Sequence, residues 1–151
     1  MILIQKALVS DAESLRSAAI SAFLGDEHGG PPEHDSVEKH VHWIRKYDYF
    51  KCVAFGNIVG GCIVKKQPYQ FELFGIFLHG NAIGKGMGSE LLRGVMKLYP
   101  AGVPWTLETP DYAGRNHRFY ERNGYIEIEK TEPDPTLGYG FIIYQRPVMD
   151  W

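Results

Sequence analysis

One stretch of the chain reads Ile76-Phe77-Leu78-His79-Gly80-Asn81-Ala82-Ile83-Gly84-Lys85-Gly86-Met87-Gly88-Ser89. An apolar run here leads into glycines, and the apolar spacing of a helix follows them. The first N–H groups of a helix have no carbonyl partner within it and carry the positive end of its dipole, so they attract anions. Glycine lets a phosphate approach the chain closely. The stretch therefore predicts a turn between strand and helix that binds a diphosphate.

Two common phosphate motifs do not fit this spacing. A dinucleotide-binding fingerprint would need its third glycine where Ser89 or Leu91 stands. Lys85 is not preceded by glycine in the spacing of a Walker loop. The sequence therefore contains neither of these two phosphate-binding motifs.

On either side of the glycines, apolar runs predict strands and a helical apolar period predicts helices. Strands are expected over residues 2–8, 49–55, 58–66, 70–78, 104–109, 125–130 and 137–146. Helices are expected over 10–24, from Ser36 onward, from Met87 to Pro100, and over 115–123. Two helices, three strands and then alternating elements predict an α/β fold in layers, of the α+β type, and disfavour a doubly wound sheet.

The first two helices have local signals of their own. Ser10 and Glu13 have the spacing of a capping box, so the first helix should begin there. Ser36 should cap the second helix. The expected buried faces are Leu15, Ala19, Ala22 and Phe23 on the first helix, and Val37, Val41 and Ile44 on the second.

The chain has two cysteines. Gly56-Asn57 predicts a two-residue hairpin turn, which would place Cys52 opposite Gly61 and turn Cys62 to the other face of the sheet. We therefore expect two buried, unpaired thiols and no disulfide.

Composition narrows the class of protein. The 151 residues carry 16 Lys and Arg against 18 Asp and Glu, for a net charge of −2, and 44% are hydrophobic. This predicts a single globular domain over residues 1–151, with no electrostatic reason to bind nucleic acid or an anionic membrane. The chain lacks a membrane-spanning apolar run and a signal-peptide pattern, so we expect a soluble, cytoplasmic protein.

The glycine stretch resembles the phosphate-binding motif of the GNAT acetyltransferase superfamily, Gln/Arg-x-x-Gly-x-Gly/Ala at a junction between strand and helix. The motif aligns with residues 83–88, where Ile83 replaces the polar first residue. The resemblance implies acetyl-CoA as acyl donor and a mixed, mostly antiparallel, seven-stranded sheet with about four helices. It implies cofactor contacts at Ile76, Phe77, Leu78, Ile83, Gly84, Lys85, Gly86, Met87, Gly88 and Ser89.

A second segment supports the resemblance. Residues 119–125, Phe-Tyr-Glu-Arg-Asn-Gly-Tyr, look like the family segment whose tyrosine donates a proton or hydrogen bond to the coenzyme A sulfur. That tyrosine is Tyr120 here. The asparagine that usually stands seven residues earlier is Ala113, and Asn116 is the nearest replacement as a cofactor contact.

Transfer of an acetyl group to an amine needs a proton acceptor, because an alkylamine with a pKa near ~10 is mostly charged at neutral pH. Glu72 lies on the strand that leads to the glycines, where resembling enzymes often carry a general base. Glu108 is a weaker candidate. The resemblance implies direct attack in a ternary complex, with backbone N–H groups of residues 76–78 beside the pantetheine and the oxyanion.

The acceptor is not encoded in a recognisable motif. Loop residues in resembling proteins line the acceptor pocket, so His28 and His34 are candidate contacts, although the pattern favours solvated loop histidines at these positions. Four acidic loop residues favour a cationic acceptor: Asp26, Glu27, Glu33 and Asp35. We expect no metal site, because His40 and His42 are two apart on a helix and face different directions.

Three alternatives stay open at this stage. The first is an N-acetyltransferase for a primary amine. The second is a non-catalytic acyl-CoA-binding or regulatory domain, which Ile83 and Ala113 support. A hydroxyl or thiol acceptor is the third option. Aromatic residues near the C-terminus permit a homodimer contact or belong to the core: Tyr139, Phe141, Tyr144 and Trp151.

Overall fold

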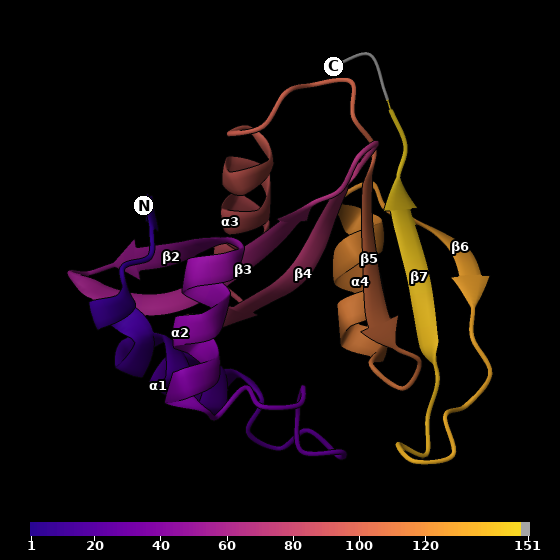
Figure 1. The fold of residues 1–151 in the computed structure, drawn as a ribbon, viewed down its shortest axis with the longest axis horizontal. Coiled ribbons are helices and arrows are strands. Elements are labelled where there is room, and N and C mark those ends of the chain that lie inside the picture. The colour runs from indigo at the N-terminus through magenta and orange to yellow at the C-terminus, as the bar shows by residue number, and fades with distance from the viewer. Residues whose placement is uncertain (149–151) are drawn as a thin grey trace. The chain divides into compact units, whose positions relative to one another are not determined.

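The computed structural model describes residues 1–148 of the chain (Figure 1). These residues form two compact units. The first unit contains residues 1–65 and 75–99, and the second contains residues 66–74 and the chain from Pro100 onward. Each unit is described by itself below. No helix among residues 1–148 is long and apolar enough to cross a membrane.

The strands form one open, mixed sheet of seven strands in the order β1-β2-β3-β4-β5-β7-β6. The pairs β1·β2, β2·β3, β5·β7 and β6·β7 are antiparallel, whereas β4 and β5 are parallel. The strands are β1 (Leu3–Lys6), β2 (Asp48–Ala54), β3 (Asn57–Lys66), β4 (Phe71–Leu78), β5 (Trp105–Pro110), β6 (Ile126–Lys130) and β7 (Phe141–Arg146). The predicted fold class is confirmed.

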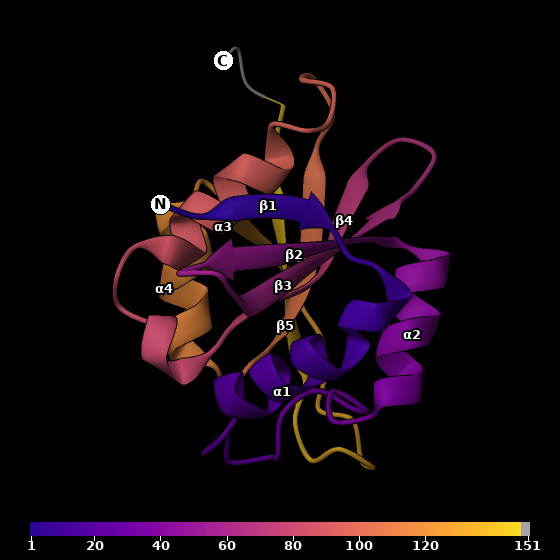
Figure 2. The same ribbon diagram turned by 90° about the vertical axis from the view of Figure 1, so that its left-hand side faces the viewer.

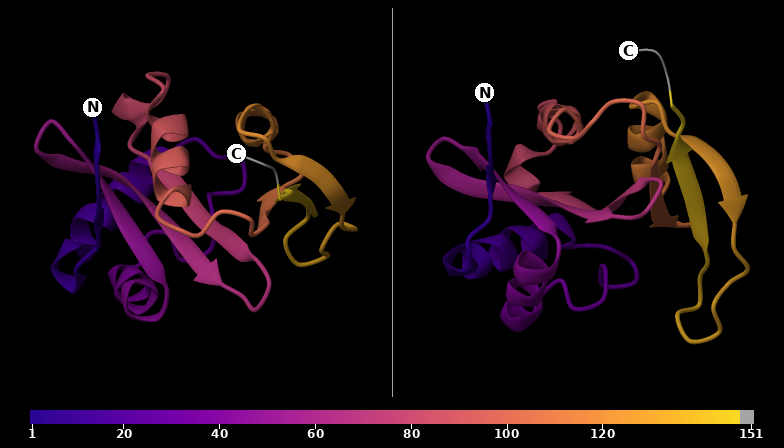
Figure 3. Two further views of the ribbon diagram at one scale, coloured as in Figure 1. Left: turned by 90° about the horizontal axis from the view of Figure 1, so that it is seen from above. Right: turned by 45° about the horizontal axis from the view of Figure 1, so that its top comes forward.

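In the first unit, helices lie on both faces of the sheet. Helices α1 (Ala12–Ala22) and α2 (Val37–Lys46) pack on one face of β1–β3, and α3 (Met87–Met96) lies on the other (Figures 2 and 3). The core beneath α1 and α2 contains Ala7, Leu15, Ala18, Ala19, Tyr49, Ile63 and Phe77. Ala22 and Phe23 pack against it, so the predicted buried face of the first helix is confirmed.

The start of the first helix differs from the prediction. A short 3-10 turn, η1 (Val9–Asp11), precedes α1, and the Leu8 N–H donates to the Asp11 carboxylate at 2.7 Å. Lys51 pairs with the same carboxylate at 2.9 Å. Burial alone would raise the pKa of Asp11, but these two donors outweigh it and lower that pKa. The predicted capping box of Ser10 and Glu13 is wrong, because the chain forms a 3-10 turn over Val9–Asp11 and α1 then begins at Ala12 with Asp11 as its N-cap residue.

The β2–β3 hairpin turns one residue earlier than predicted. Phe55 and Gly56 form the turn with φ angles of 55° and 76°. Positive φ at both positions matches the twist of the paired strands. An irregularity in the register then places Cys52 opposite Gly60 rather than Gly61.

The two cysteine thiols are buried and unpaired, as predicted. Burial raises the pKa of Cys52 to about 11 and raises that of Cys62 further. Neither thiol is therefore a reactive thiolate at neutral pH.

The buried face of α2 is centred on a histidine. Ser36 caps the helix as predicted, by accepting the Lys39 N–H at 3.1 Å. Ile44 packs against the core, as predicted, but Val37 and Val41 are only half-buried, and the fully buried residue of the helix is His40. His42 is exposed, so the two histidines do face different directions.

Two hydrogen bonds define the state of His40. Its Nε2 lies 2.7 Å from the His34 carbonyl oxygen, which only accepts, so Nε2 carries the proton. Its Nδ1 lies 2.8 Å from the Tyr49 hydroxyl, which therefore donates. The neutral imidazole satisfies both partners, and burial lowers the pKa of His40 because the charged form would lose its hydration.

In the second unit, β5, β7 and β6 follow β4, and α4 (Gly114–Arg122) connects β5 to β6. The last strand is shorter than predicted and begins at Phe141, because a turn closed by an Asp134–Tyr139 bridge occupies the preceding residues. Of the aromatics that permitted a dimer contact, Tyr139 and Tyr144 are buried and Phe141 is half-buried. Trp151 lies outside the described residues.

We expect His40 to make stability depend on pH. With its folded-state pKa lowered, the unfolded chain binds the extra proton first, so the contribution is full above about pH 6.5 and is lost as the pH falls below that value. Urea unfolding at pH 7.5 and 5.5 measures this loss. His40→Gln should reduce it, whereas the exposed control His42→Gln should not. Equal losses in both variants would contradict the prediction.

Candidate functional site

The glycine stretch forms a tight connection between β4 and α3. After Leu78, a short 3-10 turn, η2 (Gly80–Ala82), begins, and the His79 side chain accepts the Asn81 N–H at 3.1 Å. The Gly80 N–H donates to the Ser21 hydroxyl of α1 at 3.0 Å. The start of the connection is thus tied to the body of the first unit.

Two glycines in this turn have left-handed backbone conformations. Gly84 has φ of 85° and Gly86 has φ of 78°. Gly86 is the N-cap residue of α3, so the cap position offers no side chain to the N–H groups of the first turn. The first α-helical hydrogen bond at this end is from the Glu90 N–H to the Gly86 carbonyl at 3.2 Å. The open end of α3 suits an anion, as the sequence predicts.

The body of α3 is firmly packed and holds this end in place. Its buried residues are Met87, Leu91, Leu92, Val95 and Met96. On the side next to β1, Gly94 allows such a close approach that an added Cβ would meet the Ile4 side chain. The helix therefore cannot shift easily against the sheet.

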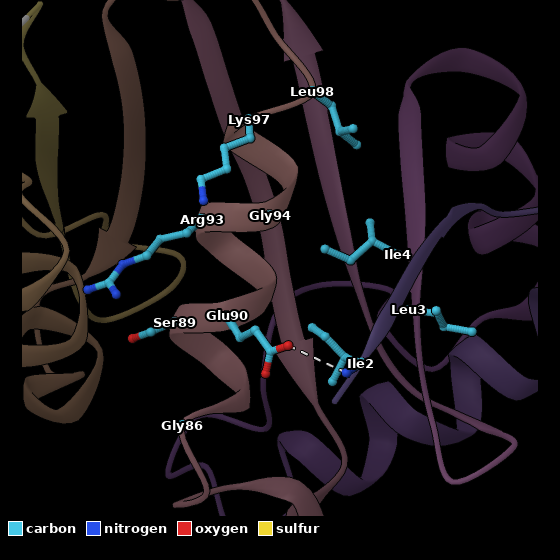
Figure 4. Close-up of a pocket in the computed structure, with 10 residues that line it drawn as sticks. All are labelled: Ile2, Leu3, Ile4, Gly86, Ser89, Glu90, Arg93, Gly94, Lys97 and Leu98. Carbon is cyan, nitrogen blue, oxygen red and sulfur yellow. Dashed lines mark hydrogen bonds between the residues drawn. The ribbon is translucent and has the colours of Figure 1, made fainter. Parts of the chain in front are cut away.

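A groove of about 540 Å³ lies between α3 and β1 (Figure 4). The Glu90 carboxylate accepts the Ile2 N–H across it at 3.4 Å. Ser89, Arg93 and Lys97 follow one another along α3 at four-residue spacing, and they point away from Ile4 in Figure 4. The glycine turn thus continues into a basic stripe on the helix.

The predicted cofactor residues of the first unit separate into two kinds. The side chains of Phe77 and Met87 are buried, and that of Phe77 belongs to the core, so only their backbone groups can contact a ligand. Lys85 is exposed, and Ile83 keeps 44% of its surface exposed. Accessible side chains and backbone amides therefore meet at the turn itself.

Glu72, the candidate base, lies in the second unit near the start of β4. It pairs in register with Thr106 of β5, next to the Phe71–Trp105 pair. Its side chain is half-buried, and its Oε1 accepts from Gln67 at 2.8 Å. Glu108, the weaker candidate, is exposed on β5.

Tyr120 also lies in the second unit, on α4. It is 9% exposed, and its ring packs against Phe119, Tyr125 and Tyr144 at centroid distances of 5.4, 5.9 and 6.1 Å. The Tyr144 hydroxyl donates to Glu121 at 2.8 Å, and burial together with this carboxylate raises the pKa of Tyr144 to about 12. Asn116 is exposed one turn before Tyr120.

The sequence of residues 38–127 matches the Acetyltransferase (GNAT) domain family, over the part of the chain that includes β4, the glycine turn and Tyr120. The chain belongs to the GNAT acetyltransferase family. The family is the one that the two motifs indicated. No curated protein matches the chain.

Solved GNAT structures share the fold over nearly the whole chain. A protein from Desulfovibrio desulfuricans assigned to the family is 19% identical, covers 99% of this chain and 100% of its own, and gives a TM-score of 0.80. The PaiA N-acetyltransferase of Thermoplasma acidophilum, solved with coenzyme A, is 20% identical, with coverage of 97% and 99% and a TM-score of 0.74.

A third GNAT structure, the ribosomal-protein-S18-alanine N-acetyltransferase of Escherichia coli, is 19% identical, covers 100% of this chain and 97% of its own, and has a TM-score of 0.77. At these identities the likeness shows the shared fold alone.

The loop histidines of this GNAT chain have structural partners. His34 Nδ1 lies 2.8 Å from the Pro31 carbonyl, and its ring packs edge-on against Phe23. The backbone N–H of His28 donates to the Asp26 side chain at 2.8 Å. In the part of the chain that the structure describes, no group of three His, Cys, Asp or Glu side chains is placed to hold a metal ion.

Sequence reasoning missed Gln67 and Gln70. They flank Pro68-Tyr69 at the β3–β4 turn, and the Gln70 side chain donates to the Gln67 side chain at 2.8 Å. The only available signal was two amide side chains on either side of a turn, three residues apart.

Gly86 should be sensitive to a side chain. Because its φ is 78°, Gly86→Ala should lower the free energy of unfolding by about 1 kcal/mol, the cost of a left-handed residue with a Cβ. Urea unfolding measures the change. Gly75→Ala is the control, because its Cβ would make only an ordinary contact with Ile63 at 3.7 Å. Equal destabilisation of both variants would contradict this reading of the turn.

Proposed function

We propose that this protein is an acetyl-CoA-dependent N-acetyltransferase that passes the acetyl group to a primary amine by direct attack in a ternary complex. The observation that carries the proposal is the open N-terminus of α3, where the left-handed Gly86 is the N-cap residue at the end of the connection from β4. The first N–H groups of a helix have no carbonyl partner within it, and this end therefore fits a pyrophosphate. Membership of the GNAT family supports coenzyme A as the molecule that carries it.

The cofactor contacts follow from this placement. The backbone of Gly84, Gly86 and Gly88 and of their neighbours would bind the pyrophosphate, and Lys85 and Ser89 supply polar side chains beside it. The backbone of residues 76–78, on β4, would run beside the pantetheine and hold the carbonyl oxygen as it gains negative charge. These fixed dipoles need no rearrangement during the reaction.

Two side chains would handle the protons. Glu72 would accept the amine proton, directly or through water, as the nitrogen bonds to the thioester carbon. Tyr120 would donate to the sulfur as the carbon–sulfur bond breaks, which releases coenzyme A as the thiol. The nearly buried ring of Tyr120 is held by three aromatic neighbours, so its hydroxyl would keep one orientation.

The loop between α1 and α2 supports a cationic acceptor. Asp26, Glu27 and Asp35 add negative charge there, whereas Glu33 is paired with Lys39 at 3.2 Å. A protonated amine would be attracted before it loses its proton to the base. We assign the loop to the acceptor side of the reaction.

The two compact units would act together as one acetyltransferase domain, because the family match runs from one into the other. The buried, unpaired cysteines support a reducing, cytoplasmic compartment.

Two departures from the family pattern favour a second candidate, a domain that binds acyl-CoA without transferring it. Ile83 stands in place of the polar residue of the motif, and Ala113 stands at the N-cap of α4, where it offers no polar side chain. Binding and turnover separate this candidate from the enzyme.

The first test is calorimetric titration of the protein with acetyl-CoA. Desulfo-CoA should also bind, because it retains both the pyrophosphate and the pantetheine arm, whereas NADH has a pyrophosphate without that arm and should not bind. Release of free thiol on mixing with acetyl-CoA and a panel of amines then measures transfer. Binding without thiol release would favour the non-catalytic domain, and no binding would refute both candidates.

Tyr120→Phe should lower kcat by about a hundredfold, since general acid catalysis contributes roughly that much, and leave acetyl-CoA affinity nearly unchanged. Steady-state kinetics and titration of the same preparation measure the two effects. Tyr139→Phe is the control, because Tyr139 is a similarly buried tyrosine of the second unit to which we assign no proton transfer. An unchanged kcat in Tyr120→Phe would remove its role as acid.

A further inference from the structure

Glu72 is held by a chain of two amide side chains. The Gln70 Nε2 group donates to Gln67 Oε1 at 2.8 Å, and the Gln67 Nε2 group donates to Glu72 Oε1 at 2.8 Å. All three side chains are half-buried. All three lie between residues 67 and 72 in the second unit, so each contact is local in the sequence.

The direction of these two hydrogen bonds is determined by chemistry. An ionised carboxylate only accepts hydrogen bonds, so the atom of Gln67 that faces Glu72 must be its nitrogen. The oxygen of the same amide then faces Gln70, whose nitrogen meets it. Gln70 therefore fixes the orientation in which Gln67 donates to the carboxylate.

Backbone hydrogen bonds hold the two glutamine residues in place. The Gln67 N–H donates to the Gln70 carbonyl at 3.0 Å and closes the β3–β4 turn, and the Phe71 N–H donates to the Pro104 carbonyl at 3.1 Å. Both glutamines thus start from fixed backbone positions, so their side chains bond without a rearrangement of the turn.

The residue opposite Glu72 on β5 donates its side-chain hydrogen bond elsewhere. Thr106 is the partner of Glu72 in the β4–β5 register, but the Thr106 hydroxyl donates to the Tyr144 carbonyl at 3.2 Å. The donor to the Glu72 carboxylate is instead Gln67, which lies in the turn that precedes β4.

We propose that Gln67, oriented by Gln70, is a positioning residue that aims the Glu72 carboxylate, with one oxygen occupied by the Gln67 donor and the other left to accept the amine proton. This inference rests on the proposed role of Glu72 as base. It adds two residues from the β3–β4 turn to the machinery of the reaction.

The first arm of the test needs no activity. In ¹⁵N-labelled protein, the Gln67 side-chain amide signal should move as Glu72 takes up its proton on acidification. The movement should disappear in Glu72→Gln. A Gln67 signal that does not respond to pH, or that responds equally in Glu72→Gln, would overturn the contact.

The second arm uses kinetics with the best acceptor of the amine panel. Gln67→Leu should lower kcat by about tenfold through misplacement of the base, with KM for acetyl-CoA unchanged. Glu72→Gln should remove the acidic limb of the pH–kcat profile. Gln70→Leu should have the same effect as Gln67→Leu in smaller measure, and it provides a second variant if Gln67→Leu does not fold.

Thr106→Val is the matched control, because it changes the residue across from Glu72 without removing a donor to it, and its kcat should match the wild type. Gln67→Leu with a wild-type kcat would overturn the inference while the proposed function stands. A Glu72→Gln variant that keeps the acidic limb would remove the base itself, and the inference with it. Absence of transfer to every amine by the wild type would instead overturn the proposed function.

Discussion

The left-handed backbone of Gly84 and Gly86 is the constraint on which the candidate site depends. It turns the chain from the end of β4 into α3 without a capping side chain, so the first amides of the helix stay open to an anion. The buried face of α3 and the close contact of Gly94 with Ile4 then hold that open end against the sheet. A pyrophosphate that binds there meets a rigid arrangement of dipoles, which need no reorganisation on binding.

Features with a local cause could be predicted from the sequence. The glycine turn, the strand before it and the helix after it each have a signature within a few residues, and Ser36 caps α2 through its own hydroxyl. The mixed sheet of seven strands came from the family resemblance and is the sheet that the structure shows.

Features with a distant cause could not be predicted in this way. The Asp11 carboxylate, which accepts the Leu8 N–H in the turn before α1, also pairs with Lys51, forty residues away. His40 becomes the centre of the buried face of α2 because Tyr49 and the His34 carbonyl satisfy its ring. An apolar pattern gives no weight to a polar residue whose partners come from tertiary structure. The positive φ of Phe55 is a similar case, because the twist of the hairpin overrides the preference of the residue.

The loop between α1 and α2 is held through its backbone. His40 binds the His34 carbonyl, and Arg16 Nε donates to the Asp35 carbonyl at 2.6 Å. Every amino acid has a carbonyl, so substitutions at positions 34 and 35 leave these two attachments intact. A lineage of such proteins can therefore exchange the side chains of this loop while the loop keeps its path.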